Sequence, residues 1–273
     1  MSAQTDAGSR PATAPAAGAP GVFRGAVAAE WTKLSSVRST WWTALAGLLV
    51  MAASAGQLAI YAANANTNDD PTDDRGVVTV GSVLIDSVEM TQYVVLALGL
   101  LAITAEFTSG TIRTTLQSTP SRGRVLLAKA AVAGAVTFVL GLLLGGVGAL
   151  VARPVLGEWG SAPAAGTFGD IVAVAIYLAL VGVLALGLGA ALRSAVLTIT
   201  VLLATLMIVP LSLQEPDIDV LNRIADVFPG VAGGHFMAGD TEPYPSLVGL
   251  LLLAGWAGAA LLLGRYALRR RDA

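Results

Sequence analysis

Six long apolar runs limit what this chain can fold into. A helix needs roughly 20 mostly apolar residues to cross about 30 Å of hydrocarbon, and each run is long enough to do so. The runs cover residues 41–63, 88–105, 126–152, 171–192, 195–213 and 247–268. The sequence therefore predicts an all-α, polytopic membrane protein with six transmembrane helices.

The composition supports this prediction. The chain has 273 residues, of which 55% are hydrophobic and 12% charged, whereas soluble domains carry about 25% charged residues. So little charge cannot cover a water-facing surface of this size. The absence of cysteine excludes disulfides, thiolate metal sites and a thiol nucleophile.

Residues 1–21 are rich in alanine, proline and glycine and have no periodicity, so we expect a disordered tail. They do not resemble a secretory signal, because the first apolar run begins only at Trp41 and is too long for a signal core. Residues 269–273 form a short basic tail after a transmembrane domain that we place at 40–268.

The basic residues predict which side each loop occupies, because lysine and arginine accumulate in cytoplasmic segments. With the N-terminus inside, 13 basic residues fall on the inner side and three on the outer side, accounting for all 16. The outer three are Arg75, Arg153 and Arg223. Of the 18 acidic residues, only Asp6, Glu30, Glu106 and Asp272 fall inside. Both termini are therefore expected in the cytoplasm.

Several features predict how the helices pack and where the protein resides. Almost no residues separate runs four and five, around positions 193–194, which predicts a tight antiparallel hairpin. Arginine outnumbers lysine 14 to 2, and alanine and glycine are abundant, as in GC-rich bacterial genomes, so we expect a bacterial plasma membrane. Small residues that allow close helix approach, within one subunit or between subunits, are Gly141, Gly145, Ala149, Gly255 and Ala259.

Residues 22–39 are helical in pattern but too charged to span a membrane. Basic residues flank one apolar stripe, which predicts an amphipathic helix lying in the membrane interface. The stripe consists of Phe23, Val27, Trp31, Leu34 and Val37, and the flanking bases are Arg24, Lys33 and Arg38.

Glu30 falls in the middle of that stripe, where a carboxylate needs a partner or loses its charge. One interpretation is a local ion pair with Lys33, or extension of the side chain to water. The other is that Glu30 ties this helix to a cytoplasmic basic residue, such as one in the polar insert that follows the second run.

That insert, residues 106–124, reads EFTSGTIRTTLQSTPSRGR. Gly110 interrupts the preceding helix and Pro120 ends a second, short helix, which presents Ile112 and Leu116 on one face with Arg113 and Gln117 beside them. Arg122, Arg124 and Lys129 form a basic step into the third run. Such a helix suits docking into a groove on another protein. The alternative is a solvated loop that holds topology or anionic lipid.

Two motifs resemble those of ABC-2-type transporter permeases. The pattern Glu106, Gly110-Thr111-Ile112, Thr115-Leu116, Pro120, Ser121-Arg122, Leu126-Leu127 and Lys129 is similar to their first cytoplasmic loop. The runs Glu30-Trp31-Thr32-Lys33-Leu34 and Arg38-Ser39-Thr40-Trp41-Trp42 resemble the connecting helix before their first span, particularly in actinobacterial members. The resemblance covers nearly the whole chain from residue 22.

The resemblance implies the membrane-spanning subunit of an ATP-driven exporter. Its partners would be a cytoplasmic ATPase subunit, which binds ATP and magnesium, and a second permease subunit, identical or different. The insert would be a coupling helix seated in a cleft of the ATPase, and residues 214–246 would hold short helices dipping into the membrane, with a helix at 220–227. The coupling role falls on Glu106, Gly110, Thr111, Ile112, Arg113, Thr115, Leu116 and Gln117, and the connecting-helix role on Glu30, Trp31, Lys33 and Arg38.

The chain itself shows no site for chemistry. No Gly-Lys-Ser/Thr phosphate-binding loop is present, and the lone His235 has no cysteine nearby. We therefore expect no enzymatic activity, no catalytic residue, no cofactor or metal in this chain, and no nucleic-acid partner. Two other functions remain open: an ion-coupled secondary transporter using Asp86 or Glu89, and a membrane scaffold or signalling partner that transports nothing.

Overall fold

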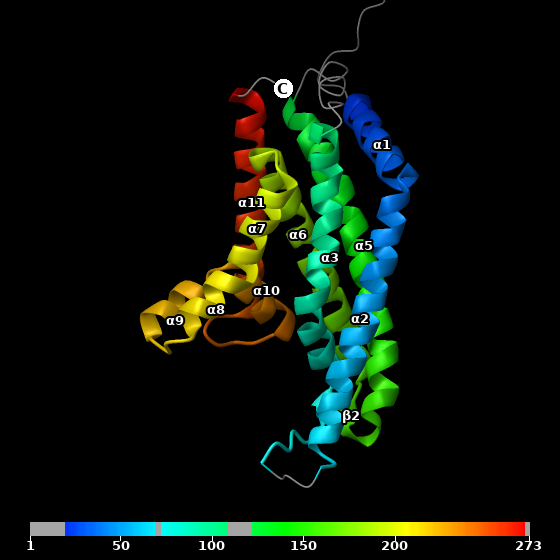
Figure 1. Ribbon diagram of the computed structural model, residues 1–273, viewed down its shortest axis with the longest axis vertical. Helices are drawn as coiled ribbons and strands as arrows, with labels where there is room; N and C mark the ends of the chain where they lie inside the picture. Colours follow the sequence, from blue (N-terminus) through cyan, green and yellow to red (C-terminus); the bar gives the residue numbers. More distant parts are fainter. Residues whose placement is uncertain (1–19, 69–71, 109–121, 271–273) are drawn as a thin grey trace, which may run out of the picture.

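The computed structural model describes residues 20–68, 72–108 and 122–270, and it is a bundle of helices (Figure 1). Six helices are long and apolar enough to cross a membrane, so the prediction of a helical protein with six candidate spans is confirmed. They are α2 (Arg38–Ala65), α3 (Val80–Thr108), α5 (Arg122–Leu156), α6 (Ala164–Leu192), the continuous α7 (Ala195–Leu203)–η2 (Ala204–Ile208)–α8 (Val209–Gln214), and α11 (Ser246–Arg270).

The helices extend beyond the apolar runs at most ends, and local backbone signals mark where α6 begins and where it meets α7. Pro163 stands at the N-cap of α6, and Arg193 ends this helix in the left-handed region at φ 55°. Ser194 then caps α7 by accepting a hydrogen bond from the backbone N–H of Leu197 at 3.3 Å. The predicted two-residue connection is therefore present.

Helix α6 occupies the centre of the bundle and packs against α3, α5 and α11. Small residues allow these close approaches. A Cβ on Gly141 of α5 would lie 2.6 Å from the Cα atom of Ala175, and one on Gly187 would lie 2.6 Å from the backbone of Ala260. Gly141 therefore serves packing within one subunit, whereas Gly255 of α11 is exposed with nothing within 4 Å.

Three peripheral spans bury only a narrow stripe of their surface. On α2 the buried positions recur every three or four residues, from Gly47 through Met51 and Ala55 to Ala62. Outward side chains such as Leu49 and Ile60 are 63% and 57% exposed. An apolar perimeter of this extent is typical of surfaces that face lipid or a partner subunit, which fits a multi-pass membrane protein.

A helix of its own, α1 (Pro20–Ser36), precedes the first span and packs against α5. The predicted segment 22–39 is divided differently in the structure, because Val37 is extended (φ −87°, ψ 120°) and α2 already begins at Arg38. Helix α1 and the last turn of α11 lie at the same end of the bundle (Figure 1). We call this the α1 end; the opposite end, where β1 (Val78–Thr79) pairs in parallel with β2 (Gly160–Ser161), is the β end.

Two short helices separate the fifth and sixth spans. Helix α9 (Asp219–Ala225) lies where the sequence predicted a helix at 220–227, and α10 (Pro229–Ala238) follows it. Pro229 occupies the first turn of α10, and Gly239 ends it with φ 74°. Both helices lie partway along the bundle and stop short of the β end (Figure 1).

Candidate functional site

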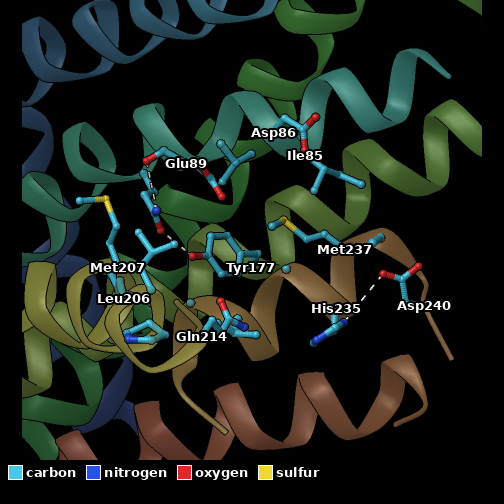
Figure 2. Close-up of a pocket in the computed structure, with 18 of the residues that line it drawn as sticks. Ile85, Asp86, Glu89, Tyr177, Leu206, Met207, Gln214, His235, Met237 and Asp240 are labelled. Carbon is cyan, nitrogen blue, oxygen red and sulfur yellow. Dashed lines mark hydrogen bonds and ion pairs between the residues drawn. The ribbon is translucent and has the colours of Figure 1, made fainter. Parts of the chain in front are cut away.

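A cavity of about 420 Å³ opens between α3, α6, the fifth span and α10 (Figure 2). This volume is within the range of small-molecule sites, about 300–1,000 Å³. Its polar lining residues are Asp86, Glu89, Gln92, Tyr93, Tyr177, Gln214, His235 and Asp240, and its apolar wall includes Ile85, Leu206, Met207, Leu211, Val231 and Met237.

A buried hydrogen-bond chain forms the inner wall of the cavity. The hydroxyl of Tyr177 donates to Oε1 of Gln92 at 2.5 Å, and Nε2 of Gln92 donates to the backbone carbonyl of Glu89 at 3.1 Å. Tyr177 and Gln92 are 2% and 5% exposed. Because both groups are satisfied and buried, they hold α6 against α3 in one arrangement.

Glycines bring α10 close enough to form the opposite wall. A Cβ on Gly233 would lie 2.1 Å from Cε2 of Tyr177, and one on Gly230 would lie 2.0 Å from the backbone oxygen of Leu206. The backbone N–H that would bond to the Leu206 carbonyl in an α-helix belongs to position 210, which is a proline. Gly230 can therefore approach this carbonyl directly.

The fifth span is locally π-helical at this wall. Residues Ala204–Ile208 form η2, and the backbone N–H of Val209 bonds to the carbonyl of Ala204, five residues earlier. Single π-helical turns occur frequently at functional sites. Leu206 and Met207, which lie within this turn, both line the cavity.

The mouth of the cavity is acidic. Asp86, Glu89 and Asp240 are exposed, as expected for residues facing an open vestibule. His235 lies between two carboxylates, with Nδ1 at 3.8 Å from Oδ2 of Asp240 and Nε2 at 3.9 Å from Oδ1 of Asp226.

The link between α9 and α10 is fixed by side chains from the following segment. The hydroxyl of Tyr244 donates to the backbone carbonyl of Asp226 at 2.5 Å, and Nε1 of Trp256 donates to the carbonyl of Val227 at 2.9 Å. Burial, reinforced by the nearby Asp226 carboxylate, raises the pKa of Tyr244 to about 12. The phenol therefore keeps its proton at neutral pH and remains a donor.

A second polar site lies near the α1 end. Nζ of Lys129 in α5 is 2.5 Å from Oε2 of Glu30, and Nζ of Lys33 is 3.1 Å from Oε1 of the same carboxylate. Lys129 is 2% exposed and Glu30 8%. We call these three residues the α1–α5 clasp. Glu30 therefore makes both the local ion pair with Lys33 and a contact with a distant basic residue. That residue is Lys129, which follows the polar insert.

The clasp also explains the orientation of α1. Glu30 faces α5, with Val27 and Leu34 half-buried beside it, whereas Phe23, Trp31 and Val37 are 40%, 55% and 49% exposed. The apolar stripe predicted for this helix is therefore divided between a face on the bundle and a face directed outward.

The remaining predicted site residues lie partly outside the described part of the chain. Gly110, Thr111, Ile112, Arg113, Thr115, Leu116 and Gln117 are outside the described residues. Glu106 belongs to the last turns of α3 and Arg122 begins α5, and the structure does not describe their side chains. Arg124 is half-buried, and Arg38 is exposed at the start of α2.

Sequence reasoning found Asp86 and Glu89 but not the cavity that they line. Gln92 and Tyr177 are polar groups inside apolar runs, a pattern that can indicate a buried contact, yet nothing in the spacing pairs one with the other. The glycines of α10 were the other feature of the sequence that could have indicated close packing at this site. No protein-family model matches the chain, and no curated protein matches it.

Proposed function

We propose that this protein is the membrane-spanning permease subunit of an ATP-driven exporter of the ABC-2 type, with both termini in the cytoplasm. A separate ATPase subunit supplies ATP hydrolysis and seats residues 106–119 in a cleft, and a second permease subunit completes the transport pathway. Helix α1 lies in the inner membrane interface, with Phe23 and Trp31 directed toward lipid.

The α1–α5 clasp is the observation that carries this proposal. Residues 109–121 connect α3 to α5, so a force applied to them by a partner reaches both helices directly. Helix α3 contributes Glu89 and Gln92 to the cavity, and α5 holds α1 through Lys129 and Glu30. A movement of the insert therefore acts on the cavity wall and on the interfacial helix together.

The proposed topology has a direct test. Reporter fusions after Asp74 and after Arg122 are expected to report the outside and the inside, respectively, because 13 of 16 basic residues fall on the inner side of this arrangement. Labelling of single introduced cysteines is a second measurement that the cysteine-free chain allows. The opposite labelling would place the insert where no cytoplasmic ATPase can reach it.

The insert is expected to hold the ATPase through its apolar pair. A double variant, Ile112→Asp with Leu116→Asp, should lose the co-purifying ATPase and transport while still inserting into the membrane, because no span is changed. Well-packed anchor residues of an interface typically contribute about 1–3 kcal/mol each. The measurement is partner retention in mild detergent, together with transport by the same variant.

Arg122→Ala with Arg124→Ala is the control, since these basic residues lie where the chain enters the third span and should affect docking much less. Retention of both the partner and transport by the double aspartate variant would refute the coupling role of the insert.

A secondary transporter is the second candidate, because Asp86 and Glu89 both line the cavity. This alternative predicts that transport continues without any ATPase and collapses with the proton gradient. Transport assays that compare the purified chain by itself with the chain together with its ATPase partner distinguish the two functions.

A further inference from the structure

We infer that the cavity between α3, α6, the fifth span and α10 binds a monovalent organic cation with an apolar body. This inference rests on the proposed export function for its biological meaning, but the binding itself requires only the cavity.

The charge of the lining is one-sided. Asp86, Glu89 and Asp240 contribute carboxylates, while among the described residues that line the cavity none is lysine or arginine. His235 is the one basic residue of this lining, and it already lies between Asp226 and Asp240. Neither Asp86 nor Glu89 makes an ion pair with another described side chain. The charge of Arg75, which is outside the lining, acts on Asp86 and offsets part of its charge, and the lining keeps an excess of negative charge that attracts a cation.

The arrangement of the carboxylates disfavours a metal ion. Asp86, Glu89 and Asp240 lie at separate places around the cavity (Figure 2). Within residues 20–68, 72–108 and 122–270, no group of three histidine or acidic side chains could hold a metal. A single diffuse positive charge, shared among carboxylates at the mouth, fits this spacing better than a compact ion that needs several oxygens at one point.

The walls favour an apolar body on the same molecule. Ile85, Met207, Leu211 and Met237 line the cavity, and methionine side chains adapt to ligands of varied shape. The rings of Tyr93 and Tyr177 also line it, and aromatic faces attract organic cations. An anion or a fully polar sugar would find neither its charge nor its hydrogen bonds matched here.

Tyr93 supplies an independent indication of a ligand. Its hydroxyl oxygen is buried and has no hydrogen-bond partner among the described residues, although buried polar groups are almost always paired. Tyr93 is part of the lining, and a small movement of its side chain would let a molecule in the cavity bond to this group.

The test uses two ions of the same shape and opposite charge, tetraphenylphosphonium and tetraphenylborate. Binding of each to the full chain in lipid nanodiscs, without any ATPase, is measured by equilibrium dialysis against empty nanodiscs. We expect tetraphenylphosphonium to bind at least tenfold more tightly than tetraphenylborate. Asp86→Asn and Glu89→Gln should each weaken cation binding by about 1.5- to fivefold, the range for exposed ionic contacts.

A steric variant tests the location. Gly234 lines the cavity, and a Cβ built on it meets nothing within 4 Å, so Gly234→Leu should add bulk at the cavity wall and weaken cation binding at least tenfold. Gly169→Leu is the matched control, since Gly169 is an exposed α6 residue that also has nothing within 4 Å. It should bind the cation as the unmodified chain does.

Equal binding of the two ions, or full cation binding by Gly234→Leu, overturns the inference. Unaltered cation binding by the double variant Asp86→Asn with Glu89→Gln, which changes the charge but hardly the shape, also overturns it. None of these outcomes depends on an ATPase, so they are distinguishable from a failure of the proposed coupling, which would appear only as loss of partner retention and ATP-driven transport.

Discussion

Lys129→Met is expected to destabilise the protein by about 3–5 kcal/mol, the usual cost of leaving one member of a buried ion pair without its partner. Glu30 is 8% exposed in the unmodified chain, and in the variant it would keep Lys33 as a counter-ion. The Lys33 side chain is 45% exposed, and its contact is an i,i+3 pair on one helix, so it cannot replace the buried base. Thermal unfolding in a fixed detergent measures the loss.

Lys33→Met is the matched control, because the same substitution then removes the exposed member of the clasp. Pairs of this kind stabilise helices by about 0.2–0.5 kcal/mol. Adding Glu30→Gln to Lys129→Met should recover part of the lost stability, since the buried carboxylate charge that lost Lys129 is then removed as well. Equal losses from the two lysine variants would show that the α1–α5 contact does not depend on the buried pair.

The clasp also predicts an order among substitutions of Glu30 itself. Glu30→Asp keeps the negative charge, and Glu30→Gln keeps the shape but removes the charge that Lys129 faces. Transport and assembly should therefore fall further with glutamine than with aspartate. Unchanged behaviour of both variants would leave the clasp without a role in function.

Gly233→Ala is expected to destabilise the protein by about 1–3 kcal/mol, the range for overpacking a filled interior. The added methyl group would lie 2.1 Å and 2.4 Å from two ring atoms of Tyr177. That ring cannot turn away cheaply, because it is buried and its hydroxyl is bonded to Gln92. Either α10 or Tyr177 must move, which opens the cavity wall.

The neighbouring residue provides the control. Gly234→Ala adds the same methyl group one position further along α10, where it meets nothing within 4 Å. Alanine is favoured over glycine inside a helix by roughly 0.5–1 kcal/mol, so this variant should be slightly stabilised. Thermal unfolding of the two variants under identical conditions should therefore shift in opposite directions, and a shift of both in the same direction would contradict the close packing of α10.

Features that repeat along the chain could be predicted from the sequence, and features that join distant residues could not. The six helices follow from apolar runs, a signal carried by neighbouring residues. Glu30 could be recognised as needing a partner, and Lys33 was the local choice. Lys129 is 99 positions away, and its contact with Glu30 depends on how α1 packs against α5.

The cavity, too, could not be predicted from the sequence, because it is formed by segments that are far apart in the chain. It needs α3, α6, the fifth span and α10 together, and α10 is too short and too rich in glycine to resemble a span. Pro229 and Gly239 do mark its ends by the usual preferences for proline at the start and glycine after the end of a helix. Nothing in that pattern indicates that Gly233 packs against Tyr177.

The π-helical turn fixes the register of the fifth span. Its inward residues Thr198, Leu202, Leu206 and Pro210 are buried at intervals of four, although residues four apart in a regular α-helix drift by about 40° at each step. The wider turn at η2 brings the later residues back into line. Deleting one residue there would return this stretch to a regular α-helix without turning Pro210 away, because Thr198 and Pro210 would then be separated by about three regular turns. The same deletion in a regular part of the span would rotate all that follows by about 100° and turn Pro210 and Gln214 out of the cavity. Outside η2 the number of residues in this span is therefore constrained independently of their identity, and an insertion or deletion there would change what the cavity recognises even where every side chain is kept.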